Sequence, residues 1–247
     1  MTCGLVGSGH VAHAFGQHFA AHGVWSGQWS RSGTEAVTGV PVVSDWSAWE
    51  VAFLAVADGA LEDVARKVPR GTWRIHFSGA KPLEAVVPAG ERGAVMWPIC
   101  SIRKEHPPIW EGVHWGVEAT DDEVLEWVDQ TLQRLGGTVH PLSGEQRLRA
   151  HAAAVFAANF TNLVLAESVD LLAGSGLPWS AMHQLAQGVL ERSADPSAVH
   201  RMTGPAARGD EATMRAHDRV LASDPALQQL YADLSARISN RALSNKA

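Results

Sequence analysis

The sequence predicts an α/β fold, a doubly wound parallel sheet followed by an all-α C-terminal domain. Three observations predict it. A glycine-rich turn joins a β-prone run to an amphipathic helix at the start of the chain, further apolar runs alternate with helical patterns, and no strand pattern is visible after about residue 144. We therefore place one domain at residues 1–143 and a second at 144–247.

The composition argues against several classes of protein. The 26 acidic and 20 basic side chains give a net charge of −6, and no run of Lys or Arg suits a nucleic acid or an anionic membrane. Only two cysteines are present, which argues against a disulfide framework. Neither a signal-peptide pattern nor an apolar run of about 18 residues is visible. We expect a cytoplasmic protein that binds neither nucleic acid nor membrane.

The chain has 12 histidines, which raises the question of a metal site. Four of them, His10, His13, His18 and His22, fall in the first predicted helix, and the last two lie one turn apart. No third ligand with recognisable spacing accompanies them, and the HExxH pattern is absent. We predict no metal site and interpret these residues as solvated helix histidines.

The first strand and helix have the spacing of a dinucleotide site. Residues 2–6 are β-prone, and the following GSGHVA fits the pattern GxGxxG/A. Gly7 permits a tight turn, Gly9 lets a pyrophosphate approach, and the small Ala12 lets the helix pack on the strand. The pattern predicts a Rossmann domain, with a glycine turn that binds no nucleotide as the alternative. The predicted cofactor contacts here are Gly7, Ser8, Gly9, His10 and Val11.

The end of the second predicted strand indicates which dinucleotide is bound. In NAD-binding proteins an Asp or Glu at this place accepts hydrogen bonds from the ribose 2′-hydroxyl, but QWSRS at residues 28–32 contains no acid. Arg31 stands between Ser30 and Ser32, a cation flanked by hydroxyl donors that suits a 2′-phosphate. Trp29 or Arg31 can stack on adenine. We predict NADP(H), while a purely surface arginine would leave the preference open.

The rest of the first domain continues the alternation. We predict strands at 51–56, 73–77, 95–97, 113–117 and 137–140, and helices at 61–68 and 121–135. In doubly wound sheets, ligands lie beyond the carboxyl ends of the strands. Residues at those ends are therefore candidate ligands: Val56, Ala57 and Asp58 for the cofactor, and Ser78, Gly79 and Pro98 for a substrate.

The second domain is predicted to be helical throughout. We expect one long helix at 145–172 and others at 179–193, 210–222 and 226–243. On an ideal helix Asn162 lies about 20° from His151 and Asn159 about 80° away, so polar groups interrupt an alanine-rich segment. We take His151 and Asn159 as candidate catalytic residues and Asn162 as a candidate substrate ligand. The alternative is a satisfied hydrogen-bond network between helices or at a dimer interface.

A glycine- and proline-containing loop at residues 202–210 supplies further donors. Thr203 and Arg208 are candidate ligands for an anionic group of the substrate. In the alternative interpretation, Asp210 caps the next helix and Arg208 pairs with it.

Five motifs together resemble a known family: GLVGSGHVA, HFSGA, MWPIC, HAAAVFAANFTN and TGPAARGD. They are similar to two-domain proteins classed as NADP oxidoreductases, which join a Rossmann-like domain to a helical C-terminal domain of unknown function. That family is distantly similar to the 6-phosphogluconate and hydroxyisobutyrate dehydrogenases, the ketopantoate reductases and the pyrroline-5-carboxylate reductases. The resemblance implies a homodimer and a substrate contact at Ser78-Gly79. The β-hydroxyacid dehydrogenases carry a catalytic lysine on the interdomain helix, and this chain has none there.

Motifs and resemblance together imply an NADPH-dependent oxidoreductase that transfers a hydride to the C=O or C=N of a small, anionic substrate. Ser78 and Asn159 or Asn162 would hold the reacting group, and His151 would donate the proton because imidazole titrates near neutral pH. Arg208 would hold a carboxylate. The alternative is a non-catalytic sensor or assembly protein that binds NADP(H), which the missing lysine favours.

Overall fold

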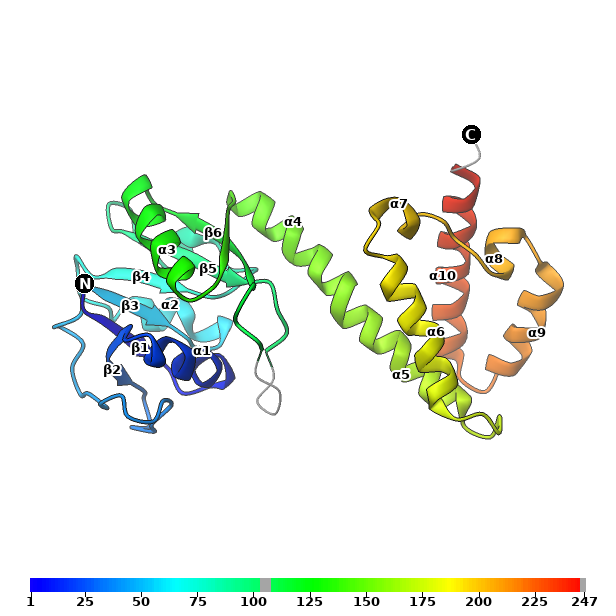
Figure 1. Cartoon of the computed structure of the whole chain (residues 1–247), viewed down its shortest axis with the longest axis horizontal. Coiled ribbons are helices and arrows are strands. Elements are labelled where there is room, and N and C mark those ends of the chain that lie inside the picture. The colour runs from blue at the N-terminus through cyan, green and yellow to red at the C-terminus, as the bar shows by residue number, and fades with distance from the viewer. Residues whose placement is uncertain (103–107, 245–247) are drawn as a thin grey trace. The chain divides into compact units, whose positions relative to one another are not determined.

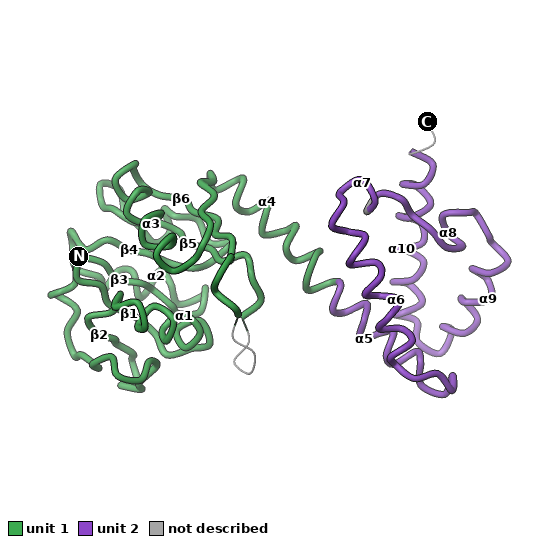
Figure 2. The backbone as a smooth tube through the Cα atoms, in the orientation of Figure 1, with its two compact units in different colours: residues 1–160 green, residues 161–247 purple. Residues whose placement is uncertain are grey.

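The computed structural model describes residues 1–102 and 108–244. The chain forms two compact units, residues 1–160 and residues 161–247 (Figure 2). The first contains a seven-stranded sheet, and the second contains only helices among its described residues (Figure 1). The domain boundary that we predict after residue 143 coincides with the start of the long helix, whereas the two compact units divide within that helix.

The sheet confirms the predicted fold class. Its strand order is β2-β1-β3-β4-β5-β6-β7. Because β1 is flanked by β2 on one side and β3 on the other, the strand order reverses at β1, and the crevice at the carboxyl ends there is the usual ligand site of an open α/β sheet. The strands are β1 (Cys3–Val6), β2 (Trp25–Trp29), β3 (Val51–Leu54), β4 (Trp73–His76), β5 (Gly93–Pro98), β6 (His114–Ala119) and β7 (Thr138–Pro141).

One strand pair departs from the parallel arrangement that we expected. Strands β5 and β6 are antiparallel, with Ala94 opposite Ala119 and Pro98 opposite Trp115, while the other neighbours are parallel. A parallel pair needs a crossover connection, usually a helix. The described parts of the connection, residues 99–102 and 108–113, contain no helix. The strand therefore returns in the opposite direction.

Helices cover both faces of the sheet. Helices α1 (His10–Ala21) and α3 (Asp122–Arg134) pack on the face that carries Phe53, and α2 (Leu61–Ala65) packs on the opposite face, which carries Leu54. Helix α4 (Gly144–Ala154) adds Ala150 and Ala154 to an apolar cluster on β5. Since successive strand residues point to opposite faces, fully apolar strands such as β3 are buried on both. Two short 3-10 turns, η1 (Asp58–Ala60) and η2 (Leu83–Ala85), complete the connections.

The helical unit contains every helix that we predicted there and two short ones that we did not. Its helices are α5 (Thr161–Leu172), α6 (Trp179–Arg192), α7 (Pro196–Val199), α8 (Pro205–Arg208), α9 (Glu211–Leu221) and α10 (Pro225–Ser244). The short additions are α7 and α8. Among the described residues of this unit, the only buried apolar ones are Ala206 and Leu221. Large apolar side chains such as Leu185 and Val189 of α6 are more than half exposed.

Helix α4, a π-helical turn η3 (Val155–Phe160) and α5 follow one another without a break. By length and composition, the resulting helix from Gly144 to Leu172 is long and apolar enough to cross a membrane, since an 18-residue window within it has a mean hydropathy of 1.4. The sequence analysis finds no uninterrupted apolar run of this length, because polar residues such as Asn159 and Asn162 interrupt it, whereas the many alanines and large apolar residues keep the window mean high. Core helices of globular proteins meet the same criterion, so this property alone assigns no membrane.

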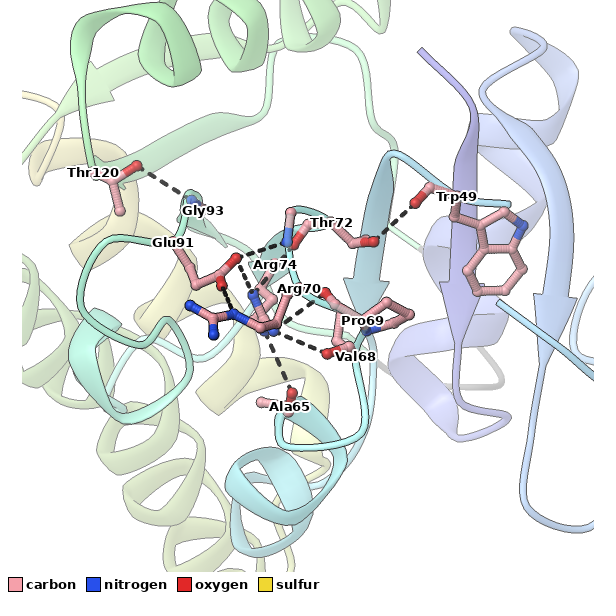
Figure 3. Close-up of polar contacts among 11 residues, drawn as sticks. Trp49, Ala65, Val68, Pro69, Arg70, Thr72, Arg74, Glu91, Gly93 and Thr120 are labelled. Atoms are coloured by element: carbon pink, nitrogen blue, oxygen red, sulfur yellow. Dashed lines mark hydrogen bonds and ion pairs between the residues drawn. The ribbon is translucent and has the colours of Figure 1, made fainter. Parts of the chain in front are cut away.

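A buried arginine stabilises the end of α2 and the turn that leads into β4 (Figure 3). Arg74 is 3% exposed, and its Nη1 lies 3.5 Å from Oε2 of Glu91. Glu91 also accepts the backbone N–H of Gly71 at 2.8 Å, and this bond and the nearby guanidinium groups lower the pKa of the Glu91 carboxyl. The guanidinium of Arg74 also donates to the backbone oxygens of Ala65, Val68, Pro69 and Thr72.

Glu91→Gln is expected to lower the free energy of unfolding by about 3 kcal/mol at neutral pH, because Arg74 is left with an uncompensated buried charge. The advantage of the wild type should be present above the ordinary carboxyl pKa of 4.5 and vanish as the pH falls through the lower pKa of folded Glu91. Urea unfolding at several pH values measures both effects. Glu84→Gln, at an exposed carboxylate, is the control. An equal loss in the two variants would contradict this role of Glu91.

Candidate functional site

The turn between β1 and α1 has the geometry that the glycine motif predicts. Gly7 has a φ of +125°, and a Cβ atom there would overlap the backbone oxygen of Ala55. A Cβ atom on Gly9 would meet no protein atom within 4 Å, so this position faces open space. The first turn of α1 carries no acidic residue, and Gly9, which precedes the helix, provides no side-chain cap. The free N–H groups at this helix end are therefore available to an anion.

The end of β2 presents a cation beside this turn. Arg31 is exposed, and within the described chain it forms no ion pair or hydrogen bond with another residue. The hydroxyl of Ser30 donates to the backbone oxygen of Thr34 at 2.9 Å, and the hydroxyl of Ser32 lies 2.7 Å from that of Thr34. These local bonds hold the loop that carries Arg31. The guanidinium itself remains free to bind an external anion.

All eleven residues that we predict to contact the cofactor line one cavity of about 660 Å³. A volume of this size is typical of a cofactor or small-ligand pocket. Asp63, Val64 and Lys67, which the sequence analysis did not select, also line the cavity. Lys67 follows the end of α2 and brings a second cation to the cavity that holds Arg31. The sequence analysis could have found Lys67 only from its position in the segment that follows the third strand, because no local motif includes this residue.

These residues fit a phosphorylated dinucleotide. The glycine turn leaves room for a pyrophosphate, the start of α1 offers backbone donors, and two cations at the same cavity match a group with extra negative charge. Trp29 lines the cavity and packs on Trp46 with ring centroids 4.8 Å apart, so a flat apolar surface is also present. The assignment of each residue to the cofactor stays a prediction.

A second cluster lies after β4. The hydroxyl of Ser78 donates to Oδ2 of Asp58 at 2.8 Å and accepts the backbone N–H of Lys81 at 3.0 Å. Asp58 also lines the cavity described above, so this hydrogen bond connects the cavity to the turn after β4. A hydroxyl has one proton to donate. In this structure the proton of Ser78 goes to Asp58, and Ser78 can donate to a substrate only if that bond opens.

The predicted proton donor lies directly on the turn after β4. A Cβ atom on Gly79 would overlap Cδ2 of His151 and would lie 2.8 Å from Nε1 of Trp97. The rings of His151 and Trp97 meet edge to face, with centroids 5.5 Å apart. Neither ring nitrogen of His151 forms a hydrogen bond with a described residue. The structure thus brings Gly79, which follows Ser78, together with His151 and with Trp97 of β5, the residue before Pro98.

Two buried residues beneath this turn were missed by the sequence analysis. Arg147 of α4 is 1% exposed and forms an ion pair with Glu118, and its Nη1 donates to the backbone oxygen of Gly79 at 2.7 Å. His76 of β4 is fully buried, and burial, together with the charge of Arg147, lowers its pKa to about 3. Its Nδ1 accepts the backbone N–H of Ser78 at 3.3 Å, whereas its Nε2 has no partner among the described residues.

The other predicted site residues lie on helices beyond this turn. Asn159 is in the π-helical turn η3, and Asn162 is the second residue of α5, in the helical unit. The ideal-helix angles that we predicted for these asparagines are wrong, because a π turn closes its hydrogen bonds over five residues and therefore changes the phase of the helix. Single π turns inside α-helices are often found at functional sites.

Thr203 and Arg208 also belong to the helical unit, before and at the end of α8. The capping role that we considered for Asp210 is present: its carboxylate accepts the backbone N–H of Thr213 at 3.1 Å at the start of α9. An ion pair between Arg208 and Asp210 is not formed in the described structure. Arg208 is therefore an exposed cation without a direct ion pair in the described chain, although its charge helps to lower the pKa of the Asp210 carboxyl after the bonds from Thr213.

Two of the four histidines of α1, His18 and His22, lie close to backbone oxygens. A ring nitrogen of His18 lies 3.0 Å from the backbone oxygen of Leu135, and one of His22 lies 2.9 Å from the backbone oxygen of His18. Across residues 1–102 and 108–244, no three His, Cys, Asp or Glu side chains gather as a metal-binding group.

Fold and site together define a two-unit protein with a Rossmann-like unit followed by a helical unit. Residues 113–238, about half of the chain, match the family model described as a domain of unknown function, DUF2520. The chain belongs to the DUF2520 family. No curated protein matches it.

Solved structures share the architecture along the whole chain. The crystal structure of a "putative NADP oxidoreductase" from Bacteroides fragilis is 24% identical, with 97% of this chain and 98% of that chain covered and a TM-score of 0.81. A Thermotoga maritima protein is 21% identical over 100% of both chains, with a TM-score of 0.71. A reductive aminase from Aspergillus terreus in complex with NADPH and ethyl-5-oxohexanoate is 13% identical, covering 97% and 91%, with a TM-score of 0.67. At these identities the likeness establishes the fold.

Gly79→Ala is expected to lower the free energy of unfolding by about 1–3 kcal/mol, because the added methyl group must displace His151 or Trp97. Denaturant unfolding followed by tryptophan fluorescence measures the change. Gly59→Ala is the matched control, since a Cβ atom there meets nothing within 4 Å. Wild-type stability in Gly79→Ala would show that the contact between the turn and His151 is not formed.

Proposed function

We propose that the chain is an NADPH-dependent oxidoreductase that transfers a hydride to the C=O or C=N of a small, anionic substrate. One observation carries the proposal. The glycine turn, the start of α1, the free Arg31 and the end of β3 all line a single cavity, and that cavity is joined through Asp58 and Ser78 to the turn on which His151 lies. The solved relatives that bind NADPH share this fold.

In this proposal the phosphates of the cofactor are held at two places in the cavity, the start of α1 and the side chains that follow β2 and α2. Backbone N–H groups at the start of α1 bind the pyrophosphate, and Arg31 and Lys67 bind the 2′-phosphate. Trp29 offers a face for adenine. When bound, the cofactor supplies the hydride, and the protein supplies orientation and electrostatics.

His151 is the proposed proton donor. Its ring nitrogens have no described hydrogen-bond partner, and its ring is fixed by Gly79 and Trp97. A positioned imidazole of this kind typically contributes about 100- to 10,000-fold to a rate by general acid catalysis. Ser78 contributes first to the shape of the turn, because its proton is donated to Asp58.

The substrate ligands of the helical unit are part of the same proposal. Asn159 and Asn162 would orient the reacting group, and Thr203 and Arg208 would bind a carboxylate. The support for an anionic substrate is that Arg208 is exposed and forms no ion pair in the described chain. A guanidinium in this state matches a carboxylate through two parallel hydrogen bonds.

We further propose that the protein is a homodimer whose copies associate through the helical unit. Of the described apolar residues in that unit only Ala206 and Leu221 are buried, and Leu185 and Val189 of α6 are 65% and 53% exposed. Exposed apolar surface on this scale marks an interface. We propose that a second copy of the chain covers this face of α6, because small residues such as Ala181, Ala186 and Gly188 allow two helices to approach closely.

NADPH is expected to bind at least tenfold more tightly than NADH, a difference of about 1.4 kcal/mol, and Arg31→Ala should remove most of that preference. Quenching of tryptophan fluorescence measures both affinities, because Trp29 lines the cavity. Lys67→Ala should weaken NADPH and leave NADH unchanged. The control is Arg149→Ala, an exposed arginine outside the cavity.

If neither NADPH nor NADH binds, the glycine turn has only a structural role and the proposed function is wrong. If NADPH binds, its oxidation with a panel of cyclic imines, and of 2-oxo acids with ammonium, tests catalysis. Binding without any oxidation would favour the non-catalytic sensor.

Sedimentation should give twice the 26.4 kDa mass of one chain at micromolar concentration. The unfolding midpoint should rise with protein concentration, because association stabilises the folded state by mass action. The double variant with Leu185→Asp and Val189→Asp tests the face on α6, with Gln184→Asp on the same helix as control. A wild type that sediments as a single chain at every concentration would contradict the dimer.

A further inference from the structure

Arg147 makes a set of contacts that joins three distant parts of the sheet unit. Its Nε and Nη2 donate to Oε2 of Glu118, on β6, at 3.1 and 2.8 Å. Its Nη1 donates to the backbone oxygens of Gly79 at 2.7 Å and of Ser78 at 3.3 Å. The guanidinium is thus held between a strand carboxylate and the turn after β4.

Stability alone is a poor explanation for this ion pair. Removing two charges from water costs several kcal/mol per ion, and apolar residues of similar volume often stabilise a fold at least as well. What the charged pair provides is a fixed orientation of the hydrogen-bonded groups. A planar guanidinium with a fixed fork of donors binds its acceptors in one geometry. Here the acceptors include two consecutive backbone oxygens of a turn proposed to contact substrate.

The same arginine also sets the position of the proposed proton donor. Arg147 and His151 are four residues apart on α4 and therefore lie on the same face, one turn from each other. The hydrogen bonds from Arg147 to the backbone oxygens of Ser78 and Gly79 hold this face of α4 against the turn. His151 consequently packs on Gly79 and against Trp97. Displacement of the helix would move the imidazole and the turn together.

We propose that Arg147, with Glu118 as its counter-charge, is a positioning residue for hydride transfer: it fixes the Ser78-Gly79 turn and the His151 imidazole relative to one another. The inference rests on the proposed function, in which this turn and His151 form the reaction site. Arg147 is 1% exposed and lies outside the lining of the cofactor cavity, so it acts through the turn and His151 and does not touch a ligand.

The test compares Arg147→Met and Arg147→Lys with the double variant in which Arg147→Met is combined with Glu118→Leu. The readout is the ring signals of His151 in NMR spectra of histidine-labelled full-length protein, assigned with His151→Asn. Ring currents of Trp97 should displace these signals in the wild type. We expect both single variants to lose that displacement. The double variant should regain the wild-type denaturant midpoint, because no buried charge is left unpaired, while its His151 signals stay altered.

Arg149→Met is the matched control, because Arg149 lies on the same helix with a side chain that is 84% exposed. It should leave the His151 signals and the midpoint unchanged. Wild-type His151 signals in the double variant would overturn the proposal and assign Arg147 a purely structural role. If the double variant does not fold, Arg147→Lys alone tests the proposal, because lysine keeps the positive charge but lacks the planar set of donors of the guanidinium. Wild-type signals in that variant would equally overturn the proposal.

Binding and turnover separate this inference from the proposed function. NADPH affinity should change less than twofold in Arg147→Lys, whereas kcat with NADPH and the anionic cyclic imine 1-pyrroline-2-carboxylate should fall about 100-fold, as expected for a small misplacement of reacting groups. Absence of NADPH binding or oxidation in the wild type would refute the proposed function. The His151 signals would still report whether Arg147 positions the imidazole.

Discussion

The alignment of parallel strand ends is the constraint on which the candidate site depends. Val6, Leu54 and His76 stand side by side at the last pairs of β1, β3 and β4, so the three following loops leave the sheet at one edge. The backbone oxygen of Ala55 approaches Gly7 so closely that no side chain fits there. The glycine turn after β1, the carboxylate of Asp58 and the turn after β4 are therefore neighbours because of sheet geometry, although they are distant in sequence.

Arginines serve two separate purposes, and their partners decide which. Arg74 and Arg147 are buried, and each donates both to a glutamate and to backbone oxygens, so their charge is used to hold turns of the fold. Arg31 and Arg208 are exposed and form no direct ion pair in the described chain, although the charge of Arg208 is felt by the Asp210 carboxyl. A partnered guanidinium has few donors left for a ligand, whereas a free one keeps its full fork. Burial and direct partners together separate the arginines that hold the fold from those that stay available to the proposed ligands, because exposed arginines such as Arg215 can also be ion-paired.

The sequence predicts those features of the fold and site that depend on residues close together in the chain. The glycine spacing, the loop around Arg31 and the ends of the apolar strands were all readable, because each depends on residues within one strand–turn–helix unit. No helix pattern was predicted between the strands at 95–97 and 113–117, which indicates an antiparallel pair, but we interpreted this segment as part of the parallel alternation. Arg147 was not recognisable, since its partner Glu118 is 29 residues away and a charged helix residue usually faces water. The π turn also escaped, because ideal α geometry was assumed.

His76 supports the turn after β4 without adding a charge to it. Burial and the charge of Arg147 lower the pKa of its imidazole to about 3, so the ring is neutral at physiological pH. It therefore brings no second positive charge close to the guanidinium of Arg147, whose counter-charge is Glu118. Because its Nδ1 accepts the backbone N–H of Ser78, the proton of the neutral ring lies on Nε2. An interior histidine here acts as a neutral acceptor for the backbone of a turn that also accepts from a buried cation.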